Sequence, residues 1–348
     1  MSVVLAPDGP LAIAHLPKVV RTEAGEALPP LHVAYRREGP RGAPVVLVMG
    51  GISAGRHAAD HAPSDTRGWW REIVRPHGPI DTQRLDVLTV DPVGGFGASS
   101  GPASQSPWPN PRLTTRDHAR ICRLWLDALE IHEPILVVGA SFGGMVGLAL
   151  AEEAPHVVAH LVAISAPDRP HPRSVGWRAV QRALVSWGVE TGHPRRGLAL
   201  ARALAMTTYR GAEELEARFG SCVAPAEPAA TSSIEAYLRA RGDAFARRAE
   251  PTAYLALSEA LDRHSVDPTR IRVPVTLVGT PSDALVPYAS LERLADAVSG
   301  PVRLLELESP RGHDAFLTEP ERLGALLRQV LAVPPSSSPL PRDPHAER

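Results

Sequence analysis

An apolar segment that runs into a glycine-rich turn around one serine is the feature that most constrains this chain. Residues 135–138 (Ile-Leu-Val-Val) lead into residues 139–144 (Gly-Ala-Ser-Phe-Gly-Gly) and then into small residues up to position 154. A short continuous apolar run is typical of a buried parallel strand, and the glycines allow a sharp turn into a helix that exposes a serine hydroxyl. The pattern therefore predicts that Ser141 is a nucleophile. The alternative is a tight turn in which Ser141 only caps the helix.

Other segments repeat the order of apolar strand, glycine loop and helix. Residues 44–49 and 85–91 are apolar, and each run opens into a loop rich in glycine. Residues 115–129 have helical apolar spacing and precede the strand before Ser141. This alternation predicts an α/β fold with a mostly parallel sheet covered by helices on both faces. Further strands are expected at 157–164, 273–279 and 302–307, with edge strands between 13 and 37.

The pattern changes after residue 165, where helical segments follow one another. We expect helices at 177–187, 197–206, 212–219 and 233–238. A helical insertion between sheet strands most simply forms a cap over the strand ends. The predicted organisation is a core of residues 13–165 and 268–333, a cap of residues 166–267, and a flexible tail of residues 334–348 that is rich in proline, serine and charge.

The composition argues against nucleic-acid and membrane partners but excludes few enzymatic functions. The 348 residues carry a formal net charge of −1, which gives no general attraction to nucleic acid or to an anionic membrane surface. The two cysteines, Cys122 and Cys222, match no metal or redox spacing and are expected to be buried and reduced. No apolar run approaches the roughly 20 residues that span a bilayer. We expect a cytoplasmic protein without nucleic-acid or membrane partners.

A serine nucleophile needs a base, and the base needs an orienting acid. His313 lies in the loop after the last predicted strand, and Asp283 lies in the loop after the strand before it. The order Ser, Asp, His is that of α/β-hydrolase triads, and all three loops would meet at one edge of the sheet. The alternative for a single histidine among fourteen is a surface or capping role.

The oxyanion that forms during acyl transfer needs two backbone donors. Phe142, which follows the nucleophile, is predicted to supply one amide. The glycine turn after residue 49 is predicted to supply the other, from Ile52. Neither contribution depends on the identity of the side chain.

The chain resembles the homoserine O-acyltransferase family of α/β-hydrolase-fold enzymes. The motifs that carry the resemblance are spread over nearly the whole chain. They lie at residues 68–70, 80–82, 93–102, 138–145, 208–210, 235–238 and 312–317 (Gly-His-Asp-Ala-Phe-Leu). The resemblance implies transfer of an acyl group from a CoA thioester to the hydroxyl of L-homoserine, an activating step of methionine synthesis. It implies no metal and no cofactor, with the CoA thioester as a co-substrate, and a homodimer joined through the cap.

In the family, a cap arginine and the aspartate after the catalytic histidine hold the amino acid, and the matching positions are Arg202 and Asp314. Arg202 lies in an almost wholly apolar helical run, where a guanidinium without a partner would be costly. A substrate carboxylate is one partner, and an ordinary salt bridge is the alternative. Tyr209 is seven residues further on and hence on the same helix face.

The acyl donor is predicted from the first glycine loop. Residues 50–57 (Gly-Gly-Ile-Ser-Ala-Gly-Arg-His), together with residues 139–145 (Gly-Ala-Ser-Phe-Gly-Gly-Met), resemble the succinyl-transferring branch more than the acetyl-transferring enzymes. Arg56 is the expected partner of the succinyl carboxylate, and a solvated loop arginine is the alternative. We therefore predict succinyl-CoA as the donor. An acetyl donor, L-serine or another hydroxyl acceptor, and a serine esterase or thioesterase that uses water are the other interpretations.

Overall fold

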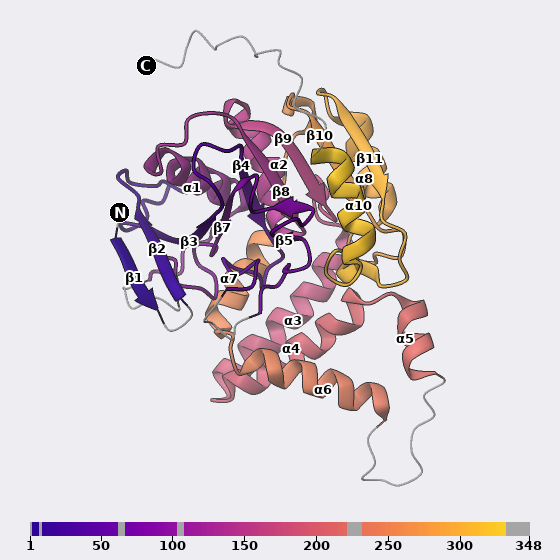
Figure 1. Cartoon of the computed structure of the whole chain (residues 1–348). Coiled ribbons are helices and arrows are strands. Elements are labelled where there is room, and N and C mark those ends of the chain that lie inside the picture. The colour runs from indigo at the N-terminus through magenta and orange to yellow at the C-terminus, as the bar shows by residue number, and fades with distance from the viewer. Residues whose placement is uncertain (1, 7–8, 62–66, 103–107, 221–231, 332–348) are drawn as a thin grey trace.

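A nine-stranded sheet forms the centre of the computed structural model (Figure 1). The model describes residues 2–6, 9–61, 67–102, 108–220 and 232–331. The strand order is β1-β2-β3-β7-β4-β8-β9-β10-β11. These strands are β1 (Ser2–Ala6), β2 (Gly9–His15), β3 (His32–Glu38), β4 (Val45–Met49), β7 (Asp86–Val90), β8 (Ile135–Ala140), β9 (Val158–Ile164), β10 (Val275–Gly279) and β11 (Val302–Glu306). A separate short pair joins β5 (Val74–Arg75) to β6 (Ile80–Asp81).

The sheet is parallel from β7 to β11 and antiparallel from β1 to β3. β3 also pairs with β7 in the antiparallel sense. The prediction of a mostly parallel sheet is confirmed, and the edge strands expected between residues 13 and 37 include β3. Because β4, β8, β10 and β11 run in the same direction, the loops that follow them meet at one edge of the sheet.

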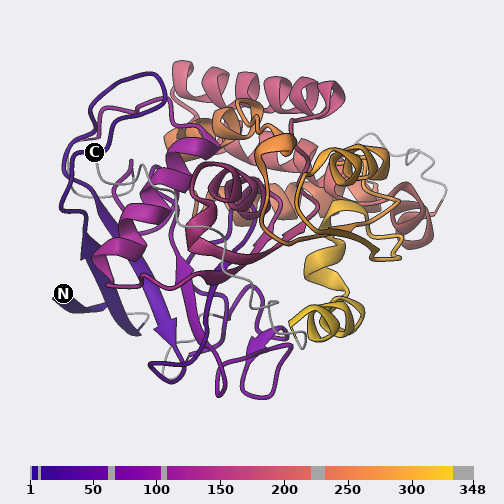
Figure 2. The same ribbon diagram turned by 90° about the horizontal axis from the view of Figure 1, so that it is seen from above.

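Helices cover the sheet on both faces (Figure 2). The helices are α1 (Thr115–Ala128), α2 (Phe142–Glu153), α3 (Pro172–Glu190), α4 (Pro194–Tyr209), α5 (Ala212–Phe219), α6 (Ser233–Ala246), α7 (Pro251–Asp262), α8 (Tyr288–Ala297), α9 (Ala315–Thr318) and α10 (Pro320–Leu331). Side chains alternate along β4: Leu47 packs in the cluster that includes α1, α2 and α8, whereas Val46 and Val48 pack in the cluster that includes α10. Strands buried on both faces explain the continuous apolar runs in the sequence.

Five helices, α3 to α7, lie between β9 and β10 in the described part of the chain. Figure 1 shows α3, α4 and α6 beside one another on one side of the sheet. Helix α7 is an addition to the four helices that the spacing predicts. Its Tyr254 packs in the small core formed with α3, α4 and α6, whereas Leu257 and Leu261 pack in the large core next to the sheet. Helix α7 therefore joins the cap to the core.

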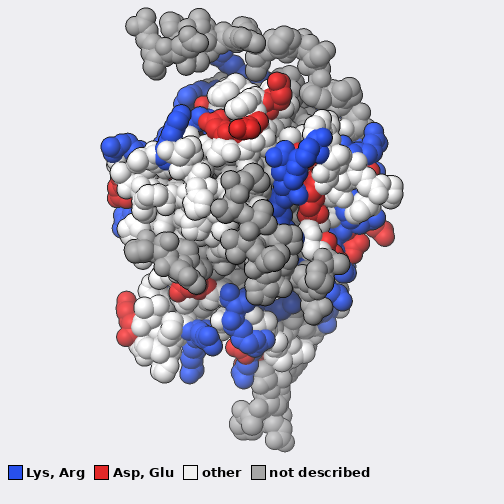
Figure 3. Space-filling model, turned by 60° about the vertical axis from the view of Figure 1, so that its left-hand side comes forward, with Lys and Arg blue, Asp and Glu red and all other residues white. Residues whose placement is uncertain are grey.

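Several sequence predictions concern positions at the margins of this fold. Cys122 is a free, buried thiol. Cys222 and the tail expected at 334–348 lie outside the described residues. Within the described residues, no helix is both long and apolar enough to cross a membrane. On the face shown in Figure 3, Lys and Arg side chains are interspersed with Asp and Glu.

Candidate active site

Ser141 lies at the end of β8 and immediately before α2, in a strained backbone conformation. Its φ of 52° and ψ of −116° are rarely adopted by a residue other than glycine, and such strain costs of order 1–3 kcal/mol. Gly143 lies directly against β4, because a Cβ at this position would overlap the carbonyl oxygen of Met49. No hydrogen bond from the Ser141 side chain caps α2, which argues against the capping role.

The Ser141 hydroxyl instead contacts His313. The distance from Ser141 Oγ to His313 Nε2 is 2.8 Å, and His313 Nδ1 lies 2.7 Å from Asp283 Oδ2. Because a carboxylate only accepts, Nδ1 donates to Asp283, and Nε2 is left to accept the Ser141 hydroxyl proton. The structure thus places the three predicted side chains in one hydrogen-bonded chain.

Backbone amides fix the carboxylate of Asp283. Its Oδ1 accepts hydrogen bonds from the amides of Leu285 at 2.8 Å and Val286 at 3.0 Å, so Oδ2 is directed at His313. Burial lowers the pKa of the His313 imidazole, but the charge and hydrogen bond of Asp283, together with the charge of Asp314, raise it above the ordinary 6.5. Asp283 therefore both orients the imidazole and stabilises its protonated form.

The predicted oxyanion donors lie on either side of Ser141. Phe142 is the first residue of α2, and the first amides of a helix have no acceptor within the helix. Ile52 lines the same pocket as Ser141 and follows Gly51, where a Cβ would lie 3.8 Å from the Cβ of Ser141. The loop after β4 and the start of α2 thus flank the serine hydroxyl as predicted from the sequence.

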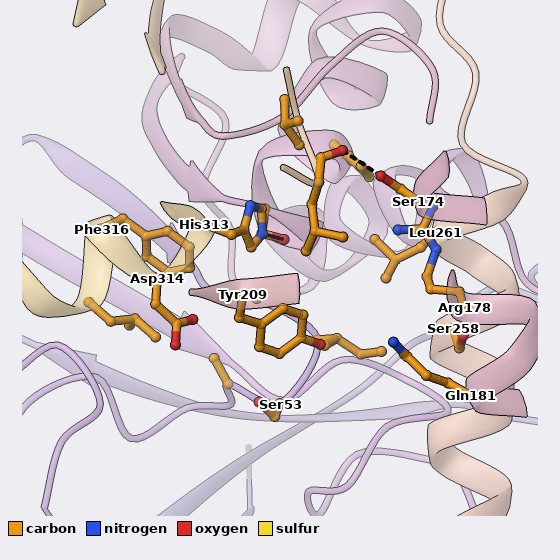
Figure 4. Close-up of a pocket in the computed structure, with 18 of the residues that line it drawn as sticks. Ser53, Ser174, Arg178, Gln181, Tyr209, Ser258, Leu261, His313, Asp314 and Phe316 are labelled. Carbon is orange, nitrogen blue, oxygen red and sulfur yellow. Dashed lines mark hydrogen bonds between the residues drawn. The ribbon is translucent and has the colours of Figure 1, made fainter. Parts of the chain in front are cut away.

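A cavity of about 260 Å³ opens at Ser141. Its lining comes from the oxyanion loop, the His313 loop and the cap helices α3, α4 and α7. Figure 4 shows His313 and Asp314 at one end and Arg178, Gln181 and Ser258 at the other, with Tyr209 between them in this view. Within the described residues, no group of three or more His, Cys, Asp or Glu side chains is arranged to hold a metal ion.

Arg202 and Tyr209 both line this cavity from α4. The Arg202 guanidinium lies 5.0 Å from the ring centroid of Tyr209 and 5.0 Å from that of Phe245. No carboxylate of the described residues lies within ion-pair distance of Arg202. The cation–π contacts are each worth about 0.5–2 kcal/mol, and Arg202 also forms a side-chain hydrogen bond with Tyr209. Burial raises the pKa of the Tyr209 hydroxyl, and the charge of Arg202 offsets part of this effect.

Asp314 lines the cavity next to His313 and is 8% exposed. Burial raises the pKa of its carboxyl, and the charge of Arg210 opposes that shift. The Nε atom of Arg210 lies 3.3 Å from Asp314 Oδ2, and Arg210 also pairs with Glu214 at 3.0 Å. Because Glu214 shares the guanidinium, Asp314 keeps part of its negative charge for a cation in the cavity.

The structure contradicts the expected position of Arg56 in the acyl pocket. Arg56 is buried, is absent from the cavity lining, and forms an ion pair with Asp91 after β7. Its backbone amide also donates to Asp91 Oδ1 at 2.8 Å, and its carbonyl accepts from Thr89 Oγ1. The solvated arginine alternative is equally wrong. A loop sequence cannot show that an acidic side chain 35 residues further along the chain will take up the guanidinium.

Most of the cavity lining was not predicted from the sequence, including the polar side chains of Arg178, Gln181 and Arg248. Arg178 and Gln181 lie on α3, within a segment whose helical spacing was recognised, but periodicity alone does not show which face meets the cavity. Arg248 follows α6, and burial together with the charges of Arg202 and Arg241 lowers the pKa of its guanidinium. The cavity therefore holds three arginines against one lining carboxylate, which favours anionic ligands.

The chain is similar to known proteins over most of its length. Residues 44–320 match the family model of the α/β-hydrolase fold. A homoserine O-succinyltransferase of Xanthomonas campestris pv. campestris is 36% identical over 92% of this chain and 86% of its own. A homoserine O-acetyltransferase of Mycolicibacterium paratuberculosis is 32% identical over 96% of this chain and 93% of its own. The chain belongs to the homoserine O-acyltransferase family.

A solved structure supports the fold of this homoserine O-acyltransferase family member. The homoserine O-acetyltransferase of Bacillus anthracis superposes with a TM-score of 0.84 over 94% of this chain and 99% of its own, at 18% sequence identity. The α/β-hydrolase fold predicted from the sequence is thereby confirmed.

Proposed function

We propose that this protein transfers a succinyl group from succinyl-CoA to the hydroxyl of L-homoserine through an acyl-Ser141 intermediate, as a step of methionine synthesis in the cytoplasm. The observation that carries the proposal is the hydrogen-bonded chain of Ser141, His313 and Asp283 at a cavity that also holds Arg202 and Asp314. The first three residues supply acyl-transfer chemistry. The last two present opposite charges to an amino-acid zwitterion.

In the first half-reaction, His313 Nε2 takes the proton of Ser141 as Oγ attacks the thioester carbonyl. The amides of Phe142 and Ile52 stabilise the oxyanion of the tetrahedral intermediate. The intermediate collapses with cleavage of the carbon–sulfur bond. The protonated His313 gives its proton to the departing thiolate, so CoA leaves as a thiol and Ser141 carries the acyl group as an ester.

In the second half-reaction, homoserine replaces CoA. Arg202 holds the substrate carboxylate and Asp314 holds its ammonium group, so that the hydroxyl lies next to His313. His313 deprotonates the hydroxyl as it attacks the acyl ester, and then returns the proton to Ser141 Oγ. Tyr209 lies between the charged groups, where its ring packs against the Arg202 guanidinium at 5.0 Å.

The choice of succinyl over acetyl donor rests on two observations. The first glycine loop resembles the succinyl-transferring branch. The Xanthomonas succinyltransferase is 36% identical, whereas an L-serine/homoserine O-acetyltransferase of Streptomyces lavendulae is 33% identical over 91% of this chain and 96% of its own. The latter relative also defines the alternatives to test, namely an acetyl donor and a serine acceptor.

A panel of donors and acceptors tests the proposal. Succinyl-CoA and acetyl-CoA are each combined with L-homoserine, L-serine or water, and the products are measured by mass spectrometry. We expect O-succinylhomoserine as the main product and, without an acceptor, one succinyl group on the protein that is absent in Ser141→Ala. Hydrolysis that homoserine does not suppress would instead indicate an esterase or thioesterase. A preference for acetyl-CoA would contradict the donor assignment.

We also propose that the protein is a homodimer joined through its cap. Helix α3 exposes Val180 and Trp187, which are 53% and 45% exposed and lie seven residues apart on one helix face. Leu200 of the adjacent α4 is 42% exposed. Large apolar side chains gathered on neighbouring helices are typical of a surface that a second protein covers.

A further inference from the structure

The wall of the cavity that lies away from His313 is built from α3 and α7. Ser174, Arg178 and Gln181 of α3 and Ser258 of α7 line this wall, and Figure 4 shows that they lie apart from His313 and Asp314. Arg178 is 9% exposed, so its guanidinium is removed from bulk water. A buried guanidinium is stable only where an opposite charge compensates its own and acceptors bind its hydrogen-bond donors.

The charge of Arg178 is only partly neutralised by the protein. Its Nε atom donates to Asp262 Oδ1, while Arg182 Nη1 lies 2.6 Å from Asp262 Oδ2. Two guanidinium groups therefore share one carboxylate, and the cluster keeps a net charge of about +1. Arg182 does not line the cavity, whereas Arg178 does. The unmet positive charge is consequently presented to a ligand by Arg178.

One donor of Arg178 also lacks a partner. Its Nη2 atom is buried and forms no hydrogen bond with the described residues. Both serine hydroxyls and the Gln181 carbonyl oxygen of this wall are engaged within the protein. Ser174 donates to the Leu285 carbonyl at 2.6 Å, Gln181 Oε1 accepts from Tyr254 at 2.8 Å, and Ser258 Oγ accepts from Arg182 at 3.1 Å.

Arg202 and Arg178 reach the cavity from different helices and have different partners. The Arg202 guanidinium of α4 packs against the rings of Tyr209 and Phe245, whereas Arg178 of α3 pairs with Asp262. Arg178 belongs instead to the wall formed by α3 and α7. The cavity thus presents arginines from two different helices, and an acyl group with its own carboxylate would contact Arg178 while Arg202 holds the amino acid.

We propose that Arg178 binds the terminal carboxylate of a dicarboxylic acyl group while the acyl carbonyl carbon lies at Ser141 Oγ. This inference rests on the proposed acyl transfer and assigns to Arg178 the donor recognition that the sequence assigned to Arg56. The carboxylate stays ionised throughout and takes no part in bond making. Its contact with Nη2 is a charge-assisted hydrogen bond that monocarboxylic donors such as acetyl or butyryl cannot form.

The test measures acylation of Ser141 in the absence of homoserine, as release of the CoA thiol in a single turnover. Succinyl-CoA is compared with butyryl-CoA, which has the same number of acyl carbons but no charge. We expect Arg178→Gln to lower the acylation rate with succinyl-CoA by about 10- to 100-fold relative to butyryl-CoA. Arg178→Lys, which keeps the charge, should recover part of the preference.

Arg173→Gln is the matched control, because Arg173 lies on the same helix but is exposed, does not pair with Asp262 and does not line the cavity. It should leave the ratio of succinyl to butyryl rates unchanged. Retained acylation by butyryl-CoA shows that a variant is folded. The inference is overturned if Arg178→Gln slows both donors equally, if Arg173→Gln changes the ratio as much, or if the wild type does not prefer succinyl-CoA. If the wild type is acylated by succinyl-CoA but does not transfer the group to homoserine, the proposed acceptor is contradicted. Recognition of the donor carboxylate by Arg178 is not affected by that result.

Discussion

Arg56 and Asp91 form a buried ion pair that ties the loop after β4 to the end of β7. The same carboxylate accepts the backbone amides of Arg56 at 2.8 Å and Ala98 at 2.9 Å. Asp91 thus holds two glycine-rich loops at once, and one of them carries the Ile52 amide. This arrangement makes Arg56 a positioning residue for the oxyanion loop and removes it from contact with the acyl group.

Replacing Arg56 should therefore affect every donor alike. We expect Arg56→Met to lower kcat/KM for succinyl-CoA and acetyl-CoA by the same factor, because the loop that carries Ile52 loosens. Loss of one partner of a buried ion pair should also lower the free energy of unfolding by about 3–5 kcal/mol. The control is Arg41→Met: Arg41 pairs with Asp86 at 2.9 Å, but its side chain is 58% exposed, so the cost should stay below about 1 kcal/mol. A selective loss of succinyl activity in Arg56→Met would restore the original assignment.

The pH dependence of acylation should follow His313. Neutral His313 is needed to accept the Ser141 proton, and Asp283 and Asp314 together raise its pKa above 6.5, so the acylation rate should rise with pH through a midpoint above 6.5. In Asp283→Asn the charge of Asp314 still raises the pKa, but the larger contribution of Asp283 is lost and burial still lowers the pKa, so the midpoint should move to lower pH. The rate should fall by roughly 10³- to 10⁴-fold. Asp127→Asn on the exposed side of α1 is the control, and an unchanged midpoint in Asp283→Asn would contradict the assigned pair.

The parts of the site that follow strands could be predicted from the sequence. Ser141 directly follows an apolar strand, Asp283 and His313 lie in the loops after two later strands, and the carboxyl ends of parallel strands meet at one edge of a sheet. Their proximity therefore depends on short-range patterns together with a general rule of topology. The same rule placed Ile52 and Phe142 beside the nucleophile.

The arginines could not be assigned in this way, because their positions depend on contacts between distant segments. Arg56 is separated from Asp91 by 35 residues, and Arg178 is separated from Asp262 by 84. Tertiary packing determines which guanidinium pairs with a carboxylate inside the protein and which one faces the cavity. Arg202 was the exception, because its apolar helical run already indicated that a guanidinium there would be buried without a local partner.

Arg202 should affect the acceptor half-reaction only. We expect Arg202→Ala to raise the KM for L-homoserine by about 10- to 100-fold, because a charge-assisted contact with the substrate carboxylate is lost. Release of CoA thiol from the donor without homoserine should change little. Arg195→Ala is the control, since Arg195 lies on the same helix and is exposed. Equal damage to both half-reactions would give Arg202 a structural role.

The cap should be sensitive to a single methyl group where it meets the His313 loop. A Cβ at Gly211 would overlap the carbonyl oxygen of Pro310. The nearest atoms all belong to the backbone of Pro310 and Gly312, so no side chain can rotate to relieve the overlap. We expect Gly211→Ala to lower both the thermal midpoint and the activity, because the loop of His313 and Asp314 must shift. Gly176→Ala is the matched control: Gly176 lies within α3 with open space around it, and alanine there should stabilise by about 0.5–1 kcal/mol. Retention of full activity in Gly211→Ala would show that this contact does not position His313.

The last prediction concerns the exposed apolar face of the cap. Sedimentation velocity at micromolar concentration should show a homodimer, because Val180 and Trp187 expose large apolar surface on one face of α3. The double variant Val180→Asp and Trp187→Glu should sediment as a monomer, since two carboxylates would be desolvated at the interface at a cost of several kcal/mol. Val19→Asp is the control: Val19 is 70% exposed and lies between β2 and β3, so the dimer should persist. A monomeric wild type would contradict the dimer, and a dimeric double variant would move the interface to another surface.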